Sequence, residues 1–274
     1  MNVAISTQVD SNAHAGVLVQ RLVQEGHPPV CVLSMAPTDM ARRLRGLLGR
    51  TYREGQARWQ QRNGSAPRSD RLLDAYARRH GIDSAKAADL PAVCAQLGVA
   101  FERAPKLTAP EAAQAMRAHS VDLLLNCGGG LFRKELLESI RVGVLNPHMG
   151  RLPPYRGYNV MEWMVLSGEM PCSTLHFIDP GIDTGDILLH RPIQREELPP
   201  DVDLAGIRAH MGAIHLELLL EGVKGLAAGT LVRQPQRLDE GRQHFAMSPK
   251  LRQLAEARWR RGGLRGCESI DSSI

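Results

Sequence analysis

Three polar residues near the middle of the chain have side chains of the types that acyl transfer requires. Asn146 and His148 flank a proline, and Asp183 follows 35 residues after His148 in a glycine-rich loop. A carbonyl carbon that becomes tetrahedral needs a hydrogen-bond donor for its oxygen, a proton carrier, and a group that orients this carrier. Each residue alone is equally compatible with a turn cap or a structural histidine. Their combination, with the turn from Leu152 to Gly157 between them, predicts a catalytic site where all three meet.

The surrounding sequence places these residues at the ends of strands. Residues 121–126 form a continuous apolar run that ends in a polar residue, as expected of a buried parallel strand. The glycine-rich turn 127–130 follows, and residues 143–146 predict the next strand. Open parallel sheets bind ligands beyond the carboxyl ends of their strands. Asn146 is therefore expected to face a cleft.

The remaining pattern predicts an α/β fold with a Rossmann-like, mostly parallel sheet. Further strands are predicted at 3–5, 30–33, 172–178 and 186–193, and helices at 13–24, 44–48, 70–79, 91–97, 108–119, 133–140 and 159–166. Thr108 and Glu111 have the spacing of a capping box. A long helix begins at Asp201 or Asp203. We expect a catalytic domain over residues 1–198 and a small, mainly helical C-terminal region over 199–274, in which residues 258–274 fray.

Composition narrows the classes of function. Aromatic residues make up only 4% of the chain, which argues against a base-stacking surface for nucleic acid despite the net charge of +5. No segment approaches the roughly 20 apolar residues of a membrane-spanning helix, and no cluster has metal-ligand spacing. We therefore expect no membrane, nucleic-acid or metal partner. The cysteines are scattered and lack a C-x-x-C pair, which indicates reduced thiols and a cytoplasmic location. They are Cys31, Cys94, Cys127, Cys172 and Cys267.

Two further groups of residues are open to a plain interpretation. His176 and His190 lie on predicted strands and are interpreted as ordinary strand residues. The arginines between Arg42 and Arg62 are interpreted as a solvated basic face, with contact to an anionic substrate or a lid as the alternative.

From about Leu124 to Ile193 the chain resembles the folate-dependent formyltransferase family, which includes methionyl-tRNA, glycinamide ribonucleotide and sugar N-formyltransferases. In that family an Asn-x-His, a Leu-Pro-x-Tyr/Trp-Arg-Gly loop and an Asp-x-Gly-x-Asp-Thr-Gly loop form the transfer site. Here they are Asn146-Pro147-His148, residues 152–157 and residues 179–185. The resemblance implies the formyltransferase version of the Rossmann-like fold, N10-formyltetrahydrofolate as donor, and an amine as acceptor.

The resemblance also implies roles for individual residues. Asn146 and a protonated His148 stabilise the formyl oxygen, while Asp183 orients His148 and helps to move a proton. Tyr155 and Arg156 are candidate substrate-binding residues, with loop anchoring as the alternative for Arg156. The implied pterin slot is lined by Cys127, Gly128, Gly129, Gly130 and Leu131, and by Ile178, Asp179, Gly181 and Ile182. For the three glycines, a plain strand-to-helix turn is the alternative.

The length of the C-terminal region limits which acceptors we expect. Methionyl-tRNA formyltransferases carry an additional C-terminal domain of the β-barrel type, whereas only 74 residues follow Pro200 here and the first of them are predicted to be helical. We therefore expect a small acceptor, such as a nucleotide-linked amino sugar or an amino-acid-derived amine. The alternatives are a methionyl-tRNA formyltransferase-like enzyme, a formyltetrahydrofolate hydrolase, and a folate-binding module without chemistry. The helical segment is also compatible with a homodimer.

Overall fold

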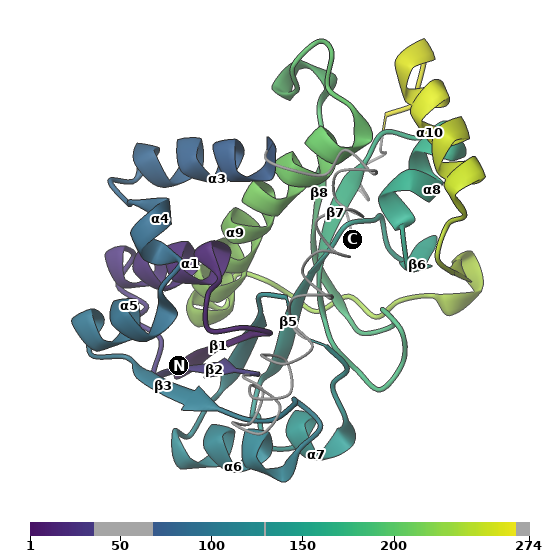
Figure 1. Cartoon of the computed structure of the whole chain (residues 1–274). Helices are drawn as coiled ribbons and strands as arrows, with labels where there is room; N and C mark the ends of the chain where they lie inside the picture. Colours follow the sequence, from purple (N-terminus) through teal and green to yellow (C-terminus); the bar gives the residue numbers. More distant parts are fainter. Residues whose placement is uncertain (36–67, 129, 267–274) are drawn as a thin grey trace, which may run out of the picture.

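The computed structural model describes residues 1–35, 68–128 and 130–266 (Figure 1). Within these residues a seven-stranded sheet has the order β3-β2-β1-β4-β5-β7-β8. Its strands are β1 (Val3–Thr7), β2 (Cys31–Ser34), β3 (Ala100–Arg103), β4 (Leu123–Asn126), β5 (Gly143–His148), β7 (Cys172–Phe177) and β8 (Ile187–Pro192). The strands from β3 to β5 are parallel, and β7 and β8 are antiparallel additions. The predicted α/β fold with a mostly parallel sheet is confirmed.

Helices cover both faces of the sheet, which makes three layers (Figure 1). They are α1 (Ala13–Gln24), α3 (Arg68–Arg79), α4 (Ser84–Ala87), α5 (Leu90–Leu97), α6 (Pro110–Ala118), α7 (Lys134–Leu137), α8 (Val160–Leu166), α9 (Leu204–Ala228) and α10 (Pro249–Arg261), with single 3-10 turns at Arg195–Glu197 and Leu238–Glu240. None of the helices in the described ranges is long and apolar enough to cross a membrane.

The sheet is buried because successive residues of its central strands pack against different layers. Leu123 and Leu125 of β4 belong to the cluster formed with α1 and α9, whereas Leu124 belongs to the cluster formed with α6 and α7. A strand that is apolar on both faces produces the continuous apolar run seen in the sequence. The polar residue at its end is Asn126, where β4 leaves the core.

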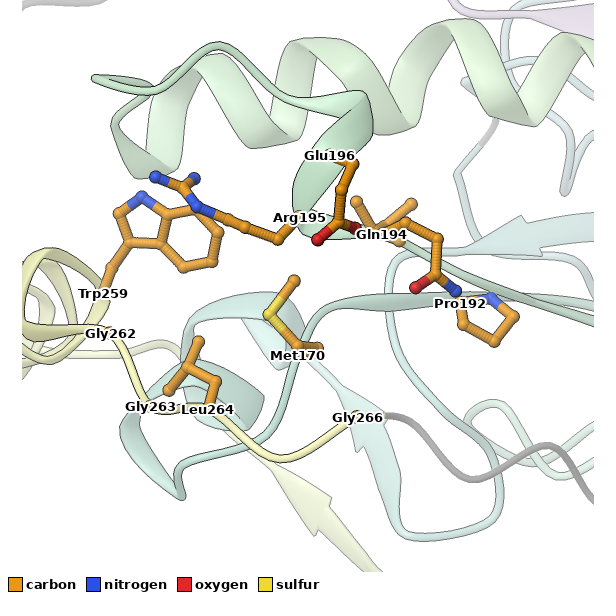
Figure 2. Close-up of a pocket in the computed structure, with 11 residues that line it drawn as sticks. Met170, Pro192, Gln194, Arg195, Glu196, Trp259, Gly262, Gly263, Leu264 and Gly266 are labelled. Atoms are coloured by element: carbon orange, nitrogen blue, oxygen red, sulfur yellow. The ribbon is translucent and has the colours of Figure 1, made fainter.

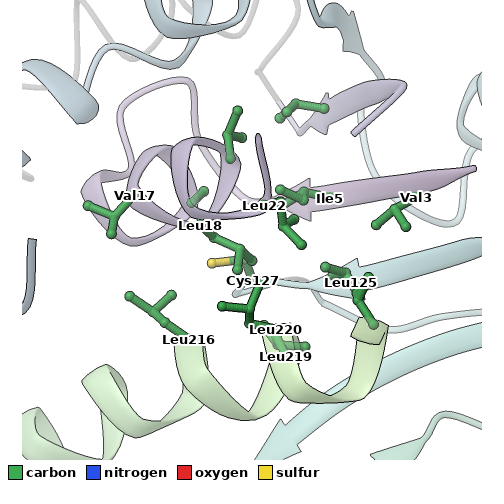
Figure 3. Packing of buried hydrophobic residues seen from close by; sticks show 14 of the residues in the cluster. Val3, Ile5, Val17, Leu18, Leu22, Leu125, Cys127, Leu216, Leu219 and Leu220 are labelled. Carbon is green, nitrogen blue, oxygen red and sulfur yellow. The ribbon is translucent and has the colours of Figure 1, made fainter. Parts of the chain in front are cut away.

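The long helix α9 is part of this core. Leu216, Leu219 and Leu220 pack in the same cluster as Leu18 of α1 and Ile5 of β1 (Figure 3). The helix begins after Asp203, whose side chain accepts a hydrogen bond from the amide of Gly206. The division of the chain at residues 198 and 199 stays a prediction, but its C-terminal part contributes this helix to the main core.

Several local expectations were wrong, each for a structural reason. Ala109, not Thr108, caps α6, and no side chain makes a capping hydrogen bond there. The helix predicted at 133–140 is reduced to the four residues of α7. Strand β3 was missed because it lies at the sheet edge and is only partly buried, which removes the apolar pattern of a central strand. The short helix predicted at 44–48 and the arginines of 42–62 lie outside the described residues.

The C-terminal segment is more ordered than its composition indicates. Residues 249–261 form α10, and Trp259 is buried with its indole Nε1 donating to the carbonyl of Val202 at 2.6 Å. The expected fraying is therefore wrong for this part of 258–274, and residues 267–274 lie outside the described chain. The turn at 152–157 also contains a short strand, β6 (Tyr155–Gly157), which pairs in parallel with β9 (Arg242–His244).

Candidate active site

Asn146 lies in a row of three polar residues on neighbouring strands. Asn126 ends β4, Asn146 lies on β5 directly opposite His176 of β7, and β4 and β5 run side by side. The amide nitrogen of Asn126 donates to Oδ1 of Asn146 at 2.8 Å, and Nδ2 of Asn146 lies 3.0 Å from Nε2 of His176. The row therefore holds both ends of the Asn146 amide.

The protonation of His176 follows from its surroundings. Its Nδ1 lies 2.8 Å from the carbonyl oxygen of Phe177, so Nδ1 carries the hydrogen that this acceptor needs. Burial, with a further effect of His148, lowers the pKa of His176 to about 4. The ring is thus neutral near pH 7, and its Nε2 accepts from Asn146. Among the described residues no hydrogen bond uses the second hydrogen of Asn146 Nδ2, which remains for an incoming oxygen.

His148 is buried at the end of β5 with an acceptor at each ring nitrogen. Its Nε2 lies 2.8 Å from the carbonyl oxygen of Tyr155, which requires the hydrogen on Nε2. Its Nδ1 lies 3.5 Å from Oδ2 of Asp183. That separation is long for a hydrogen bond but within the range of an ion pair.

Asp183 lies in the loop between β7 and β8 with a left-handed backbone, φ 53°. The backbone amide of Gly157 donates to its Oδ2 at 2.9 Å, and its Oδ1 lies 3.6 Å from Nε2 of His176. The structure therefore brings Asn146, His148 and Asp183 together as predicted, and it adds Asn126 and His176 to the group.

His176 corrects an expectation from the sequence, because it is not an ordinary strand residue. The signal was present in its position: β7 is buried throughout, and a buried histidine in such a strand needs polar partners. Asn126 was noticed only as the polar end of an apolar run. Its pairing with Asn146 depends on strand register, which the run does not encode.

Two cavities meet at the row of Asn126 and Asn146. The smaller, of about 210 Å³, opens on the side of the Asp183 loop and is lined by Asn126, Gly130, Leu131, Phe132, Asn146, His176, Ile178, Asp179, Pro180, Gly181, Ile182 and Asp183. The larger, of about 440 Å³, opens towards α1 and α9 and is lined by Asn12, His14, Asn126, Cys127, Gly128, Asn146, Pro147, Met149, Gly212, His215, Leu216 and Leu219. Asn146 thus lines both cavities.

The residues predicted to line a pterin slot divide between these cavities. Gly130, Leu131, Ile178, Asp179, Gly181 and Ile182 line the smaller one. Cys127 and Gly128 line the larger one instead, because they lie at the start of the turn nearest to α1. Gly129 lies outside the described residues.

Tyr155 and Arg156 have their polar groups engaged within the chain. The hydroxyl of Tyr155 donates to Glu169 at 3.0 Å. The guanidinium of Arg156 donates to the carbonyls of Leu238 and Gly241, at 3.3 and 3.1 Å. These contacts are those of loop anchoring, and a role for either residue in binding substrate stays a prediction.

The same site also has the geometry of a metal-ligand group, which spacing in the sequence did not indicate. One ligand atom each from His148, His176 and Asp183 lie within 4.8 Å of one another. They come from three separate elements, so no short motif marks them. However, Nε2 of His176 already accepts a hydrogen bond from Asn146, and a metal ion would have to displace it.

A further cavity, of about 320 Å³, lies between α10 and the 3-10 turn Arg195–Glu197 (Figure 2). The guanidinium carbon of Arg195 lies 4.5 Å from the centroid of the Trp259 ring. This cavity shares no lining residue with the two cavities at Asn146.

The central part of the chain is similar to proteins of known function. Residues 73–197 match the family model described as formyl transferase. A methionyl-tRNA formyltransferase of Ruminiclostridium cellulolyticum is 33% identical over 141 residues, which is 51% of this chain and 44% of that protein. One from Trichlorobacter lovleyi is 32% identical over 151 residues, 54% of this chain and 46% of that protein. The matched region thus spans less than half the length of these curated relatives.

Solved structures share the fold over a greater length. Glycinamide ribonucleotide transformylase 1 from Symbiobacterium toebii has a TM-score of 0.57 at 17% identity, covering 86% of this chain and 93% of that one. A sugar N-formyltransferase from a Shewanella species has a TM-score of 0.55 at 13% identity, covering 94% and 87%. The family match contains Asn146, His148 and Asp183, and the fold agrees across the sheet. The central part of the chain is therefore similar to the formyltransferase family, and the described residues share the fold of solved formyltransferases.

Proposed function

We propose that this protein transfers a formyl group from N10-formyltetrahydrofolate to the amine of a small acceptor. The observation that carries the proposal is the position of Asn146: its amide has a fixed orientation, a hydrogen left to donate, and a cavity on either side. A formyl carbon on one side and an amine on the other would meet at this amide.

The smaller cavity suits the folate donor. Leu131 and Ile182 line it and keep 68% and 40% of their surface exposed, so a flat apolar ring would cover them. The loop from Asp179 to Asp183 offers backbone groups to the edge of such a ring, with Gly181 permitting close approach. When bound, the donor supplies the formyl group, and tetrahydrofolate is the leaving group.

The residues of the chain then have separate tasks. Asn146 Nδ2 donates to the formyl oxygen as the carbon becomes tetrahedral and the oxygen gains negative charge; one such donor contributes about 3 kcal/mol to lowering the barrier. His148, with its Nε2 hydrogen committed to Tyr155, exchanges a proton only through Nδ1. The carboxylate of Asp183 beside Nδ1 holds that proton on its way from the acceptor nitrogen to N10 of the leaving folate.

The acceptor reaches Asn146 through the larger cavity. Its volume of about 440 Å³ suits the amine-bearing part of a small molecule, such as a nucleotide-linked amino sugar or an amino-acid-derived amine. The curated relatives, as methionyl-tRNA formyltransferases, favour an aminoacyl-tRNA as the alternative acceptor. Only an unprotonated amine attacks, so the rate is expected to fall at acid pH.

The test mixes the protein with formyl-folate and a panel of amines, including methionyl-tRNA, and follows release of tetrahydrofolate by absorbance and the formylated product by mass spectrometry. Formylation of a small amine, abolished in an Asn146→Ala variant, is the expected result. Release without any amine indicates a hydrolase. Tight folate binding without release indicates a binding module, and either outcome contradicts the proposal.

A further inference from the structure

The loop that contains Asp183 depends on hydrogen bonds from outside the loop. A left-handed backbone is unfavourable for a residue with a Cβ, and Asp183 has φ 53°. Its carboxylate must nevertheless lie between Nδ1 of His148 and Nε2 of His176, at 3.5 and 3.6 Å. Something must therefore hold the backbone in place while the side chain faces the site.

Gln236 makes these hydrogen bonds. It lies in the extended segment between α9 and β9, more than 50 residues beyond the loop in the sequence. Its side-chain Nε2 donates to the carbonyl oxygens of both Asp183 and Gly185, at 3.1 and 2.6 Å. The two acceptors determine the orientation of the amide, because the reverse orientation would place an oxygen against two oxygens.

The opposite end of the same side chain is left unsatisfied. Oε1 of Gln236 is buried and has no hydrogen-bond partner among the described residues. A buried acceptor without a partner destabilises the folded protein. An apolar side chain of similar shape would not bury an unpaired acceptor. The amide of Gln236 is therefore explained by the two hydrogen bonds that it donates to the loop.

The same segment also holds the other side of the site. Gln234 pairs through its backbone with Ile187, just after the loop, at 2.8 and 2.9 Å. Further along, β9 pairs with β6, whose Gly157 amide binds the carboxylate of Asp183. One C-terminal segment thus holds both the backbone of Asp183 and the group that binds its side chain.

We propose that Gln236 is a positioning residue for Asp183, which acts by fixing the backbone of the 183–185 loop from the C-terminal segment 234–244. The inference rests on the formyl transfer proposed above. The titratable groups that face this carboxylate are His148 from β5 and His176 from β7, and Asp179 lies in the same loop.

The test compares Gln236→Met, which keeps the shape but removes both donors, with Gln234→Met as the matched control, since the side chain of Gln234 is exposed and its pairing is through the backbone. We expect Gln236→Met to lower kcat roughly 10- to 100-fold, because small misplacements in an active site have effects of this size. Gln234→Met should stay within about twofold of the wild type.

A second readout does not depend on turnover. NMR titration of the His176 imidazole reports the position of the Asp183 carboxylate, which lies 3.6 Å from its Nε2, and the titration should change in Gln236→Met but not in Gln234→Met. A Gln236→Met protein with a lowered melting temperature but an unchanged His176 titration and an unchanged kcat would show a purely structural role and overturn the inference. A wild type that forms no formylated product contradicts the proposed function instead, and the imidazole titration still decides the role of Gln236.

Discussion

The side-chain amide of Asn126 donates a hydrogen bond to Oδ1 of Asn146 at 2.8 Å, and this contact determines which way the amide of Asn146 faces. With its oxygen held by Asn126 and one amide hydrogen directed at His176, Asn146 presents its remaining hydrogen at the junction of the two cavities. A preorganised donor of this kind stabilises developing charge without reorganising during the reaction.

Replacing Asn146 tests the donor directly. Asn146→Asp keeps the size of the side chain but replaces its NH₂ with an acceptor, and kcat is expected to fall by roughly 10²- to 10³-fold. The measurement is steady-state release of tetrahydrofolate, with circular dichroism to verify the fold. A variant that retains more than half of the wild-type kcat would remove Asn146 from the mechanism.

Replacing Asn126 tests the orientation of the donor. Asn126→Leu leaves Asn146 in place but releases Oδ1 of its amide, so we expect kcat to fall about tenfold, a smaller loss than for Asn146→Asp. In the double variant the two losses should not add, because the second contact has no function once the first residue is changed. Additive losses in this double-mutant cycle would contradict the link between the two residues.

Three histidines predict how stability depends on pH. Burial lowers the pKa of His176 and His190 to about 4, and that of His215 to about 3. The unfolded chain binds protons at these side chains near pH 6.5, whereas the folded chain does not bind them until the pH is much lower. The stability from these groups is therefore complete above about pH 6.5 and is lost as the pH falls towards 4.

Urea unfolding at pH 7.5 and pH 5 measures this dependence. The unfolding midpoint should be lower at pH 5, and His190→Gln should make the difference between the two pH values smaller. A midpoint that is equal or higher at pH 5 would show that these imidazoles do not remain neutral in the folded protein.

Gly157 is predicted to tolerate no side chain. Its φ is 99°, and a Cβ there would overlap the backbone carbonyl oxygen of His244 across the β6–β9 pair. Gly157→Ala is therefore expected to lose about 1–3 kcal/mol of stability and to disturb the amide that binds Asp183. Thermal unfolding provides the measurement, and Gly26→Ala is the control. Gly26 also has a positive φ but has open space around it, so the control shows the loss due to backbone strain alone.

Replacing Trp259 tests whether α10 packs against the rest of the chain. Removing this buried indole in Trp259→Ala should lower the free energy of unfolding by about 3–5 kcal/mol, as for other large core side chains. Exposed Leu254 of the same helix is the control, and Leu254→Ala should change it by less than about 0.5 kcal/mol. Equal effects of the two substitutions would mean that α10 does not pack as described.

The sequence by itself determined the central strands of the sheet and the polar residues at their ends. Three features of the sequence are local patterns. They are the apolar run of β4 with the polar residue that ends it, the Asn-Pro-His segment, and the glycine-rich loop of Asp183. From these, the α/β fold and three of the residues at the site could be predicted, because strand period and strand termini are encoded within a few neighbouring residues.

Only the tertiary structure decided how these residues meet. The register that aligns Asn126, Asn146 and His176 depends on packing against both helical layers, and it is the sum of many long-range contacts rather than a local pattern. The same holds for Gln236, which reaches the Asp183 loop from another part of the chain. Trp259 lies in a segment of polar composition and is buried because distant residues such as Met161, Ile193 and Ile207 pack in the same cluster. Local sequence specifies elements and their ends, whereas the contacts between distant elements form only when the whole core closes.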